Sequence, residues 1–279
     1  MFFRKPDWWW DATWTPVSGC RKVSPGCAQC WSLPWLKCHT WTVPTVYTGA
    51  IEEAADGSMR WTGDATALRA GDPRWDFPLT DFRDGVVNPA LGPGKPNLIF
   101  AVVDGDLFYD VRPLADINRV CRTLVASKHL GLLCTKYTPQ MVEYIASVDS
   151  RSMQRWQQKL LLGFSAETQK WFNHRWADLR PFADAGLFVY VALSPLLEQI
   201  TLPPDFLALG QRTWVVVYGE CNRWEPARCR PVDANWVRAI RDQCRAAGIP
   251  FFLRGMHTGA YIPPDLVNIR QFPSLPWLA

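Results

Sequence analysis

Three cysteines near the start of the chain have the spacing to hold a metal centre. Cys20, Cys27 and Cys30 form a C-x6-C-x2-C pattern, with the turn-forming run Ser24-Pro25-Gly26 after the first thiol. Three thiolates on a four-iron cluster leave one iron open for a substrate or cofactor, whereas four thiolates would close it. The pattern therefore suits a [4Fe-4S] cluster on these three cysteines, with the aromatic side chain of Trp31 beside the open iron.

A structural zinc site is the alternative for the same thiols. His39 or Cys38 would supply the fourth ligand of a tetrahedral centre, and the C-x2-C pair suits zinc well. Spacing alone does not choose between zinc and iron–sulfur. With tryptophans and arginines nearby, a zinc site would indicate a nucleic-acid-binding module rather than an enzyme.

The remaining cysteines carry weaker signals. Cys221 and Cys229 are either two free thiols of a loop, which we favour, or ligands of a second metal site. Three others lie on predicted apolar strands or helix faces and are expected to be small core residues: Cys121, Cys134 and Cys244. Nine cysteines without an evident secretory signal indicate a reducing compartment, the cytoplasm, where clustered thiols bind metal more often than they form disulfides.

Length, hydropathy and charge bound the class of protein. The chain has 279 residues, 48% of them hydrophobic, which suffices for one large core, so we expect a single domain over residues 1–279. It has no run of about 18 apolar residues, which argues against a membrane span. Residues 112–180 carry a net charge of +6, although the whole chain carries only +4. This basic middle third suits a phosphate-bearing partner, and a solvated set of helix faces explains it equally well.

Short apolar runs alternate with helical patterns from residue 97 onward, which is typical of strand–helix units. Helices are expected around 117–124, from an N-cap at Thr138 to about 148, from about 168 to 185, and from a cap at Asp233 to a stop at Gly248. Strands are expected at 98–103, 130–134, 160–164, 187–193, 214–218 and 250–253, with a weaker one at 12–17.

Nearly continuous apolar strands of this kind form parallel sheets that are covered on both faces. The order of elements predicts an α/β fold, a partial or closed TIM-type (β/α) barrel, with a doubly wound open sheet as the structural rival. The cysteine loop, residues 19–31, would follow the first strand. Residues from about 45 to 96 lack clear periodicity and are interpreted as an irregular insertion rather than a second domain.

Polar or charged residues follow each predicted strand. In a (β/α) barrel these strand ends lie on one face, where active sites are built. Helix capping is the simpler interpretation of any one such residue, but the set as a whole favours an active site. The candidate catalytic residues are Asp106, Lys136, Glu167, Glu220 and Arg254, and the candidates for cofactor contact include Ser165 and Gly219.

Several stretches of the chain together resemble one family. They begin at Asp11–Cys20 and continue through Cys30, and further ones are Gly105–Phe108, Thr135-Lys136, Gly163–Glu167, Gly219-Glu220 and Asp233–Phe252. These stretches are similar to a phage- and prophage-associated three-Cys-motif family that is related to the radical S-adenosylmethionine (SAM) superfamily. The chain departs from that pattern at the strand ends where the active site is expected. It has Cys221 where the family tends to have serine, Ser194 in place of a glutamate, and Arg254 in place of a lysine; the usual superfamily spacing is C-x3-C-x2-C.

The resemblance implies a [4Fe-4S] cluster and SAM as cofactors, with an external electron donor. The reduced cluster would cleave the C5′–S bond of SAM, and the deoxyadenosyl radical would abstract hydrogen from a substrate. Trp31 would contact the adenine and Glu220 the SAM ammonium, with Gly219, Ser165 and Glu167 as further contacts. Lys136 and Arg254 would bind a carboxylate or phosphate. The substrate stays open between a nucleotide or nucleic-acid base and a small metabolite or peptide.

Overall fold

The computed structural model describes residues 8–39, 46–80 and 96–275 of the chain. They cluster into two compact units. The first comprises residues up to 22 together with 32–162, and the second comprises residues 23–31 together with 163–277. The segment 23–31, which carries two of the three motif cysteines, therefore belongs to the second unit although it interrupts the first in sequence. That the whole chain folds as one domain stays a prediction.

Seven strands make the main sheet, in the order β1-β6-β7-β8-β9-β10-β11. Four of the neighbouring pairs have a parallel register: β1–β6, β6–β7, β9–β10 and β10–β11. After β1 the order follows the sequence without the reversal that a doubly wound sheet requires. The mixed α/β architecture and this order are consistent with a partial barrel. Among the described strands β1 and β11 are the ends of the order, so these strands do not close a ring.

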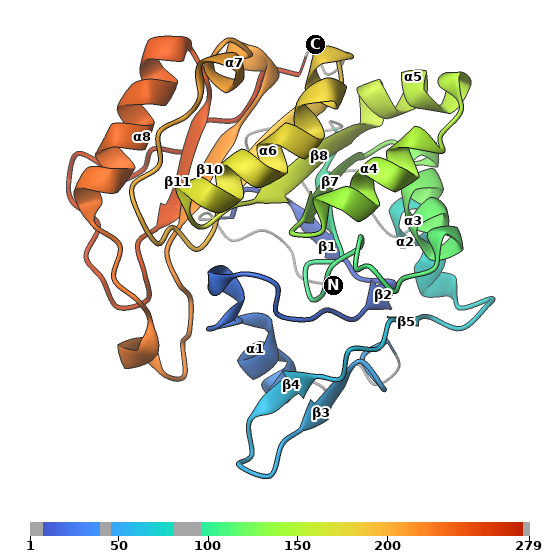
Figure 1. Ribbon diagram of the computed structural model, residues 1–279. Coiled ribbons are helices and arrows are strands. Elements are labelled where there is room, and N and C mark those ends of the chain that lie inside the picture. Colours follow the sequence, from blue (N-terminus) through green and yellow to red (C-terminus); the bar gives the residue numbers. More distant parts are fainter. Residues whose placement is uncertain (1–7, 40–45, 81–95, 276–279) are drawn as a thin grey trace. The chain divides into compact units, whose positions relative to one another are not determined.

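The first unit is built on the strands β1 (Ala12–Trp14), β6 (Leu98–Ala101) and β7 (Leu130–Thr135). Helix α3 (Leu114–Ala126) packs against β7 because its apolar stripe at helical spacing is fully buried (Figure 1). Helix α4 (Thr138–Ala146) begins at Thr138, with Tyr137 at the N-cap position, so the predicted cap is displaced by one residue. Helix α5 (Ser150–Lys159) was not predicted, since Trp156 is its one fully buried side chain.

The region interpreted as an irregular insertion contains regular structure in its described part. Strands β3 (Ile51–Glu53) and β4 (Met59–Trp61) form an antiparallel hairpin, and β5 (Thr66–Ala67) pairs with β2 (Val17–Ser18). A 3₁₀ turn, Pro73–Asp76, and the short helix α2 (Phe77–Thr80) follow. The predicted strand at 12–17 is thus two strands, β1 and β2, which belong to different sheets. Residues 81–95 of the predicted insertion lie outside the described residues.

Four further strands and three further α-helices follow in the described chain, most of them within the second unit. Strand β8 (Leu160–Ser165) is followed by α6 (Gln169–Asp184), and β9 (Phe188–Leu193) and β10 (Val215–Tyr218) run parallel to each other. Helix α6 packs against β9 (Figure 1). The last strand is β11 (Phe251–Gly255). Arg254 lies within β11, not after the strand as predicted.

Helix α8 (Ala234–Ala247) has the predicted ends. The side chain of Asp233 accepts a hydrogen bond from the Asn235 amide at 2.8 Å, and Gly248 ends the helix with a left-handed φ of 69°. The short helix α7 (Pro204–Leu207) packs against α8. Both boundaries were readable because each depends on one residue of special chemistry.

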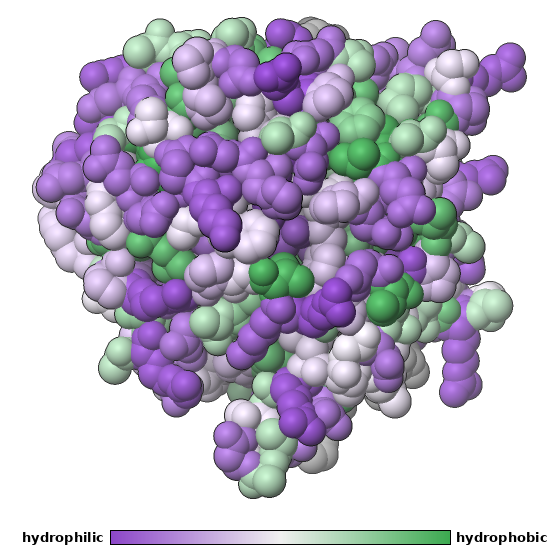
Figure 2. Space-filling view, in the orientation of Figure 1, coloured by the Kyte–Doolittle hydropathy of each residue, from purple (hydrophilic) through white to green (hydrophobic). Residues whose placement is uncertain are grey.

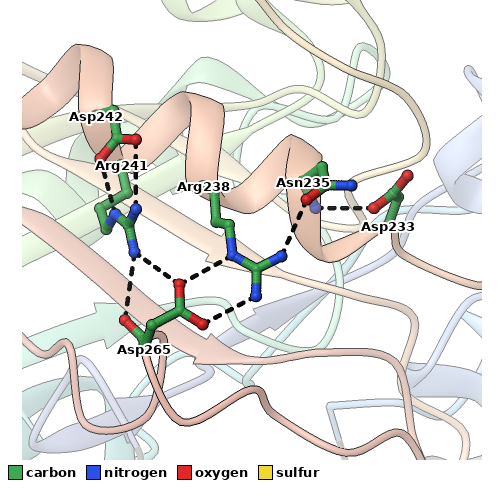
Figure 3. Close-up of polar contacts among 6 residues, drawn as sticks. All are labelled: Asp233, Asn235, Arg238, Arg241, Asp242 and Asp265. Atoms are coloured by element: carbon green, nitrogen blue, oxygen red, sulfur yellow. Dashed lines mark hydrogen bonds and ion pairs between the residues drawn. The ribbon is translucent and has the colours of Figure 1, made fainter.

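An ion-pair network fastens α8 to the segment after β11 (Figure 3). Asp265 accepts hydrogen bonds from Arg238 at 2.9 Å and from Arg241 at 3.1 Å, and Arg241 also pairs with Asp242. The hydrogen bonds from Arg238 hold the pKa of Asp265 well below its usual range. This network is solvent-exposed, so we assign it to stability rather than to function.

The surface carries scattered rather than continuous hydrophobic area. The face in Figure 2 is mostly hydrophilic, with small separate hydrophobic areas. Exposed large apolar side chains include Trp31, Val111, Trp224 and Tyr261. Within the described ranges no helix has the length and hydropathy to cross a membrane.

Candidate functional site

The first motif cysteine lies on a tightly fixed stretch of the first unit. Gly19 has a φ of 121°, and a Cβ there would come within 2.3 Å of the Asp64 carbonyl oxygen, so only glycine fits. The Gly19 carbonyl accepts a hydrogen bond from the amide of Asp106 at 3.1 Å. On the other side of Cys20, the Tyr137 hydroxyl accepts from the Arg21 amide at 3.2 Å and donates to the Arg21 carbonyl at 3.0 Å. The backbone on both sides of Cys20 is therefore held.

Asp106, a predicted catalytic residue, is a buried acceptor that links two strand-end loops of the first unit. Its carboxylate accepts from the Thr135 hydroxyl at 2.6 Å and from the backbone amides of Phe108 and Lys136 at 3.0 Å each. Burial raises the pKa of Asp106, and these hydrogen bonds oppose the rise. Lys136 enters the same cluster through its backbone, and its side chain is half-buried.

The second and third cysteines lie on a turn of the second unit. Pro25–Cys27 form one 3₁₀ turn, closed by hydrogen bonds from the Cys27 amide to Ser24 at 2.9 Å and from the Ala28 amide to Pro25 at 3.2 Å. The Cys27 sulfur lies 3.7 Å from the Ser24 hydroxyl. Neither Cys27 nor Cys30 forms a disulfide, and both are partly exposed.

Glu167, predicted to touch the cofactor, is completely buried and forms an ion pair with Arg175 of α6. The Nη1 of Arg175 donates to Glu167 Oε2 at 3.0 Å and to the Ser165 carbonyl at 2.7 Å. The other carboxylate oxygen of Glu167 accepts from the amide of Gly26, in the cysteine turn, at 3.3 Å. The hydroxyl of Ser165 donates to the Ser194 carbonyl at 2.9 Å.

Glu220 is also buried and is engaged by an arginine. Its carboxylate accepts from the backbone amide of Arg230 at 2.7 Å and from the guanidinium Nε at 2.9 Å, with a further contact to Nη2. The same Nη2 donates to the Pro25 carbonyl at 2.9 Å. Gly219 lies against the backbone of the turn after β11: a Cβ there would come within 2.3 Å of the His257 nitrogen. A larger residue than glycine does not fit at position 219.

Arg254, a predicted anion-binding residue, and Trp31, the predicted aromatic contact, differ in exposure and in their neighbours. Arg254 is half-buried, with its guanidinium 4.2 Å from the centre of the Tyr218 ring. Trp31 is 39% exposed.

In the second unit Glu167 contacts the cysteine turn directly, and Glu220 reaches it through Arg230. Ser165 and Gly219 have other partners, the Ser194 carbonyl and the backbone near His257. In the first unit Asp106 joins the Lys136 backbone to the segment before Cys20.

Sequence reasoning missed Arg175 and Arg230, which engage the two buried glutamates. Arg175 did leave a signal: it stands on the apolar stripe of α6, between Phe172 and Leu179, where a charged residue requires a buried counter-charge. Arg230 leaves no such signal in the sequence, because it follows an irregular loop and meets Glu220 only in the folded structure.

Of the three cysteines predicted to be core residues, Cys121 and Cys244 are fully buried. Burial raises the pKa of both thiols, that of Cys244 to about 12. Cys134 is only partly buried, so the prediction is wrong for this residue. Cys221 and Cys229 form no disulfide, as expected of free thiols, and Cys229 is buried. Among the described residues no three or more His, Cys, Asp or Glu side chains are arranged to hold a metal ion.

Fold and site together define an α/β protein with a parallel sheet, whose strand-end loops carry a partly exposed cysteine motif and buried acidic residues. Residues 7–271 match a family described as a protein of unknown function (DUF5131), and the chain belongs to this family. No curated protein and no solved structure matches the chain.

Proposed function

We propose that this protein is a radical SAM-type iron–sulfur enzyme, related to the phage-associated three-Cys-motif family. The observation that carries the proposal is the contrast between its thiols. Cys20, Cys27 and Cys30 form no disulfide and are all partly exposed, whereas Cys121 and Cys244 are buried in the core. Accessible thiols on held backbone are the type of donor that a cluster requires.

The residues present fit such a cluster by their chemistry. The motif supplies three soft sulfur donors, and Cys27 follows a turn that is fixed by hydrogen bonds on both sides. When bound, a four-iron cluster with one open iron supplies the electron that cleaves SAM to a deoxyadenosyl radical. Trp31 provides an exposed aromatic surface next to Cys30 for the adenine ring.

We propose that the chain's own residues then bind a substrate and exclude water from it. Lys136 and Arg254 are the cations that would bind a carboxylate or phosphate, and the stacked Tyr218 ring orients the Arg254 guanidinium. The net charge of +6 on residues 112–180 favours a nucleotide or nucleic-acid base over a small metabolite or peptide. This proposal includes a partial TIM-type barrel, a cytoplasmic location and an external electron donor.

Metal content and SAM cleavage test the proposal. The anaerobically purified protein should be brown, with about four irons per chain, and dithionite-reduced protein should release 5′-deoxyadenosine from SAM. Cys20→Ala, Cys27→Ala and Cys30→Ala should each abolish the cluster, whereas Cys244→Ala, at a buried thiol, should retain it. Full iron content in Cys27→Ala would contradict the site assignment.

The same experiment separates the zinc alternative. Cys38 is exposed near the end of α1 (Ser32–His39) and is a candidate fourth zinc ligand. A colourless protein with one zinc per chain that is lost in Cys38→Ala would overturn the iron–sulfur proposal. For the substrate, binding of single-stranded oligonucleotides should weaken steeply with salt. Stimulation of deoxyadenosine release by a non-phosphorylated small molecule, with no oligonucleotide binding at low salt, would reject the nucleic-acid substrate.

A further inference from the structure

We propose that two carboxylate–arginine pairs, one fully buried and one with a partly exposed arginine, hold a single peptide group, Pro25–Gly26, and so fix the position of Cys27 before any metal binds. The proposal rests on the function proposed above only for what Cys27 is positioned to hold. It assigns Glu167 and Glu220, with Arg175 and Arg230, as positioning residues rather than as groups that touch SAM.

The geometry is that of a clamp on both ends of one peptide group. The carbonyl of Pro25 and the amide of Gly26 belong to the same peptide unit, with the C=O and N–H pointing in opposite directions. The C=O accepts from Arg230 Nη2 at 2.9 Å, and the N–H donates to Glu167 Oε1 at 3.3 Å. All of these residues belong to the second unit.

Each side of the clamp is itself held by a charge pair. Arg230 is bound to Glu220 through its backbone amide and its guanidinium, and the Glu220 side chain is only 1% exposed. Glu167 is bound to Arg175, and both side chains are fully buried. The Arg175 guanidinium also lies 4.4 Å from the centre of the Trp171 ring. Neither side chain that touches the peptide is therefore free to swing away.

The peptide is seated too closely for a side chain at Gly26. A Cβ there would lie 3.1 Å from Cδ of Pro195 and 3.2 Å from Cδ of Glu167. Both neighbours are held in place. Glu167 has its ion pair with Arg175, and the residue after Pro195, Leu196, donates its backbone amide to the Tyr218 carbonyl at 2.9 Å. The absence of a side chain is what lets the carboxylate reach the backbone.

A fixed peptide at this place restricts the cysteine that follows it. The Cys27 amide donates to Ser24 and the Ala28 amide to Pro25, so the clamped unit lies inside the 3₁₀ turn that carries the thiol. Ligands of a metal site lose conformational freedom when the metal binds, and a loop that is already ordered loses less. The clamp would therefore speed cluster loading and set the environment of the iron nearest Cys27.

Hydrogen exchange of the metal-free, reduced full-length protein tests the clamp without relying on the cluster. Arg230→Gln removes the guanidinium that donates to Pro25, at a side chain that is 36% exposed. The buried Glu220 carboxylate keeps the backbone amide of residue 230 as a donor, so folding should survive. Mass spectrometry should show exchange of peptides covering residues 23–31 that is faster by about tenfold or more, the factor expected for a lost hydrogen bond to a charged donor. Exchange in α8 serves as the internal reference.

Arg228→Gln is the matched control, because Arg228 stands in the same loop and its guanidinium pairs with the exposed Glu225. It should leave residues 23–31 as in the wild type. In reconstituted protein Arg230→Gln should load iron more slowly and shift the electron paramagnetic resonance spectrum, and Arg228→Gln should do neither. Glu167→Gln, which keeps an acceptor for the Gly26 amide but removes the charge, is the second variant and should loosen the same peptides.

The outcomes separate the clamp from the proposed function. Unchanged exchange of residues 23–31 in Arg230→Gln, or an equal increase in α8, overturns the clamp even if the wild type holds four irons. Faster exchange confined to residues 23–31 supports the clamp even if the wild type takes up no iron, and in that case the radical SAM proposal fails on its own.

Discussion

Removing either partner of the Glu167–Arg175 pair should cost far more stability than removing a surface ion pair from the same helix. Both side chains are completely buried, and their Nη1 to Oε2 distance is 3.0 Å. Loss of one partner leaves the other charge buried without compensation, which costs about 3–5 kcal/mol in the free energy of unfolding. Arg180 supplies the control: it lies one helical turn further along α6, is 55% exposed, and pairs with Asp184 and Asp205. Arg180→Met should cost about 0–1 kcal/mol.

The two single variants should be coupled in their effect on stability, because they remove the two partners of one ion pair. The double variant Glu167→Gln with Arg175→Met leaves no buried charge, and its loss should be well below the sum of the two single losses.

Thermal and urea unfolding, followed by tryptophan fluorescence, measure these differences. A loss of 3–5 kcal/mol corresponds to a fall in Tm of roughly 10 °C, from about 2–4 °C per kcal/mol in domains of about 150–250 residues. The reasoning is refuted if Arg175→Met is no less stable than Arg180→Met at pH 8. It is equally refuted if the double variant is destabilised by the full sum of the single variants.

Two further predictions concern buried and exposed carboxylates. Arg238 and Arg241 lower the folded-state pKa of Asp265. Asp265 therefore contributes stability above its unfolded pKa of about 4, and this contribution is lost as the pH falls below that value. Asp265→Asn should lower Tm at pH 7 and make Tm fall less steeply as the solution is acidified. Burial raises the pKa of Asp104 to about 7, with the Tyr47 hydroxyl 3.3 Å away. The folded-state pKa of Asp104 exceeds the unfolded value, so the protonated carboxyl favours folding below pH 4, and that advantage is lost as the pH rises to 7. Asp104→Asn should therefore raise Tm at pH 8 but not at pH 4. An equal change in Tm at both pH values would contradict the assignment.

The strands of the sheet were predictable from sequence because a parallel strand that is buried on both faces has a continuous run of apolar residues. The six runs from residue 98 to residue 253 all form strands, and α8 ends where its cap and its glycine indicate. Helix α5 was not predictable in this way, because its sequence Ser-Arg-Ser-Met-Gln-Arg-Trp-Gln-Gln-Lys buries one side chain and shows no apolar period. The β3–β4 hairpin is short and largely exposed, so it also lacks a pattern.

The candidate site was predictable as a set of residues but not as a set of roles. Position after a strand selects Asp106, Glu167 and Glu220 as candidate site residues, and all three are buried in the structure. It does not say what each carboxylate binds, because the partner of each lies far away in sequence or on a loop without a motif: Gly26 is 141 residues from Glu167. Residue spacing identifies candidate ligands that are close in sequence, such as Cys27 and Cys30. It does not identify contacts between residues that are far apart in sequence.

The three strand-end carboxylates share one arrangement, and it changes how polar strand ends are to be interpreted in this protein. Each accepts a backbone amide of a neighbouring loop: Asp106 accepts those of Phe108 and Lys136, Glu167 that of Gly26, and Glu220 that of Arg230. A buried carboxylate that is satisfied by backbone amides and an arginine has little capacity left for a ligand, because each oxygen already has its donors. These carboxylates therefore shape the loops that carry the thiols and Lys136. For this reason Arg230→Gln, which changes no residue proposed to touch the cluster or the substrate, is expected to alter the cysteine turn.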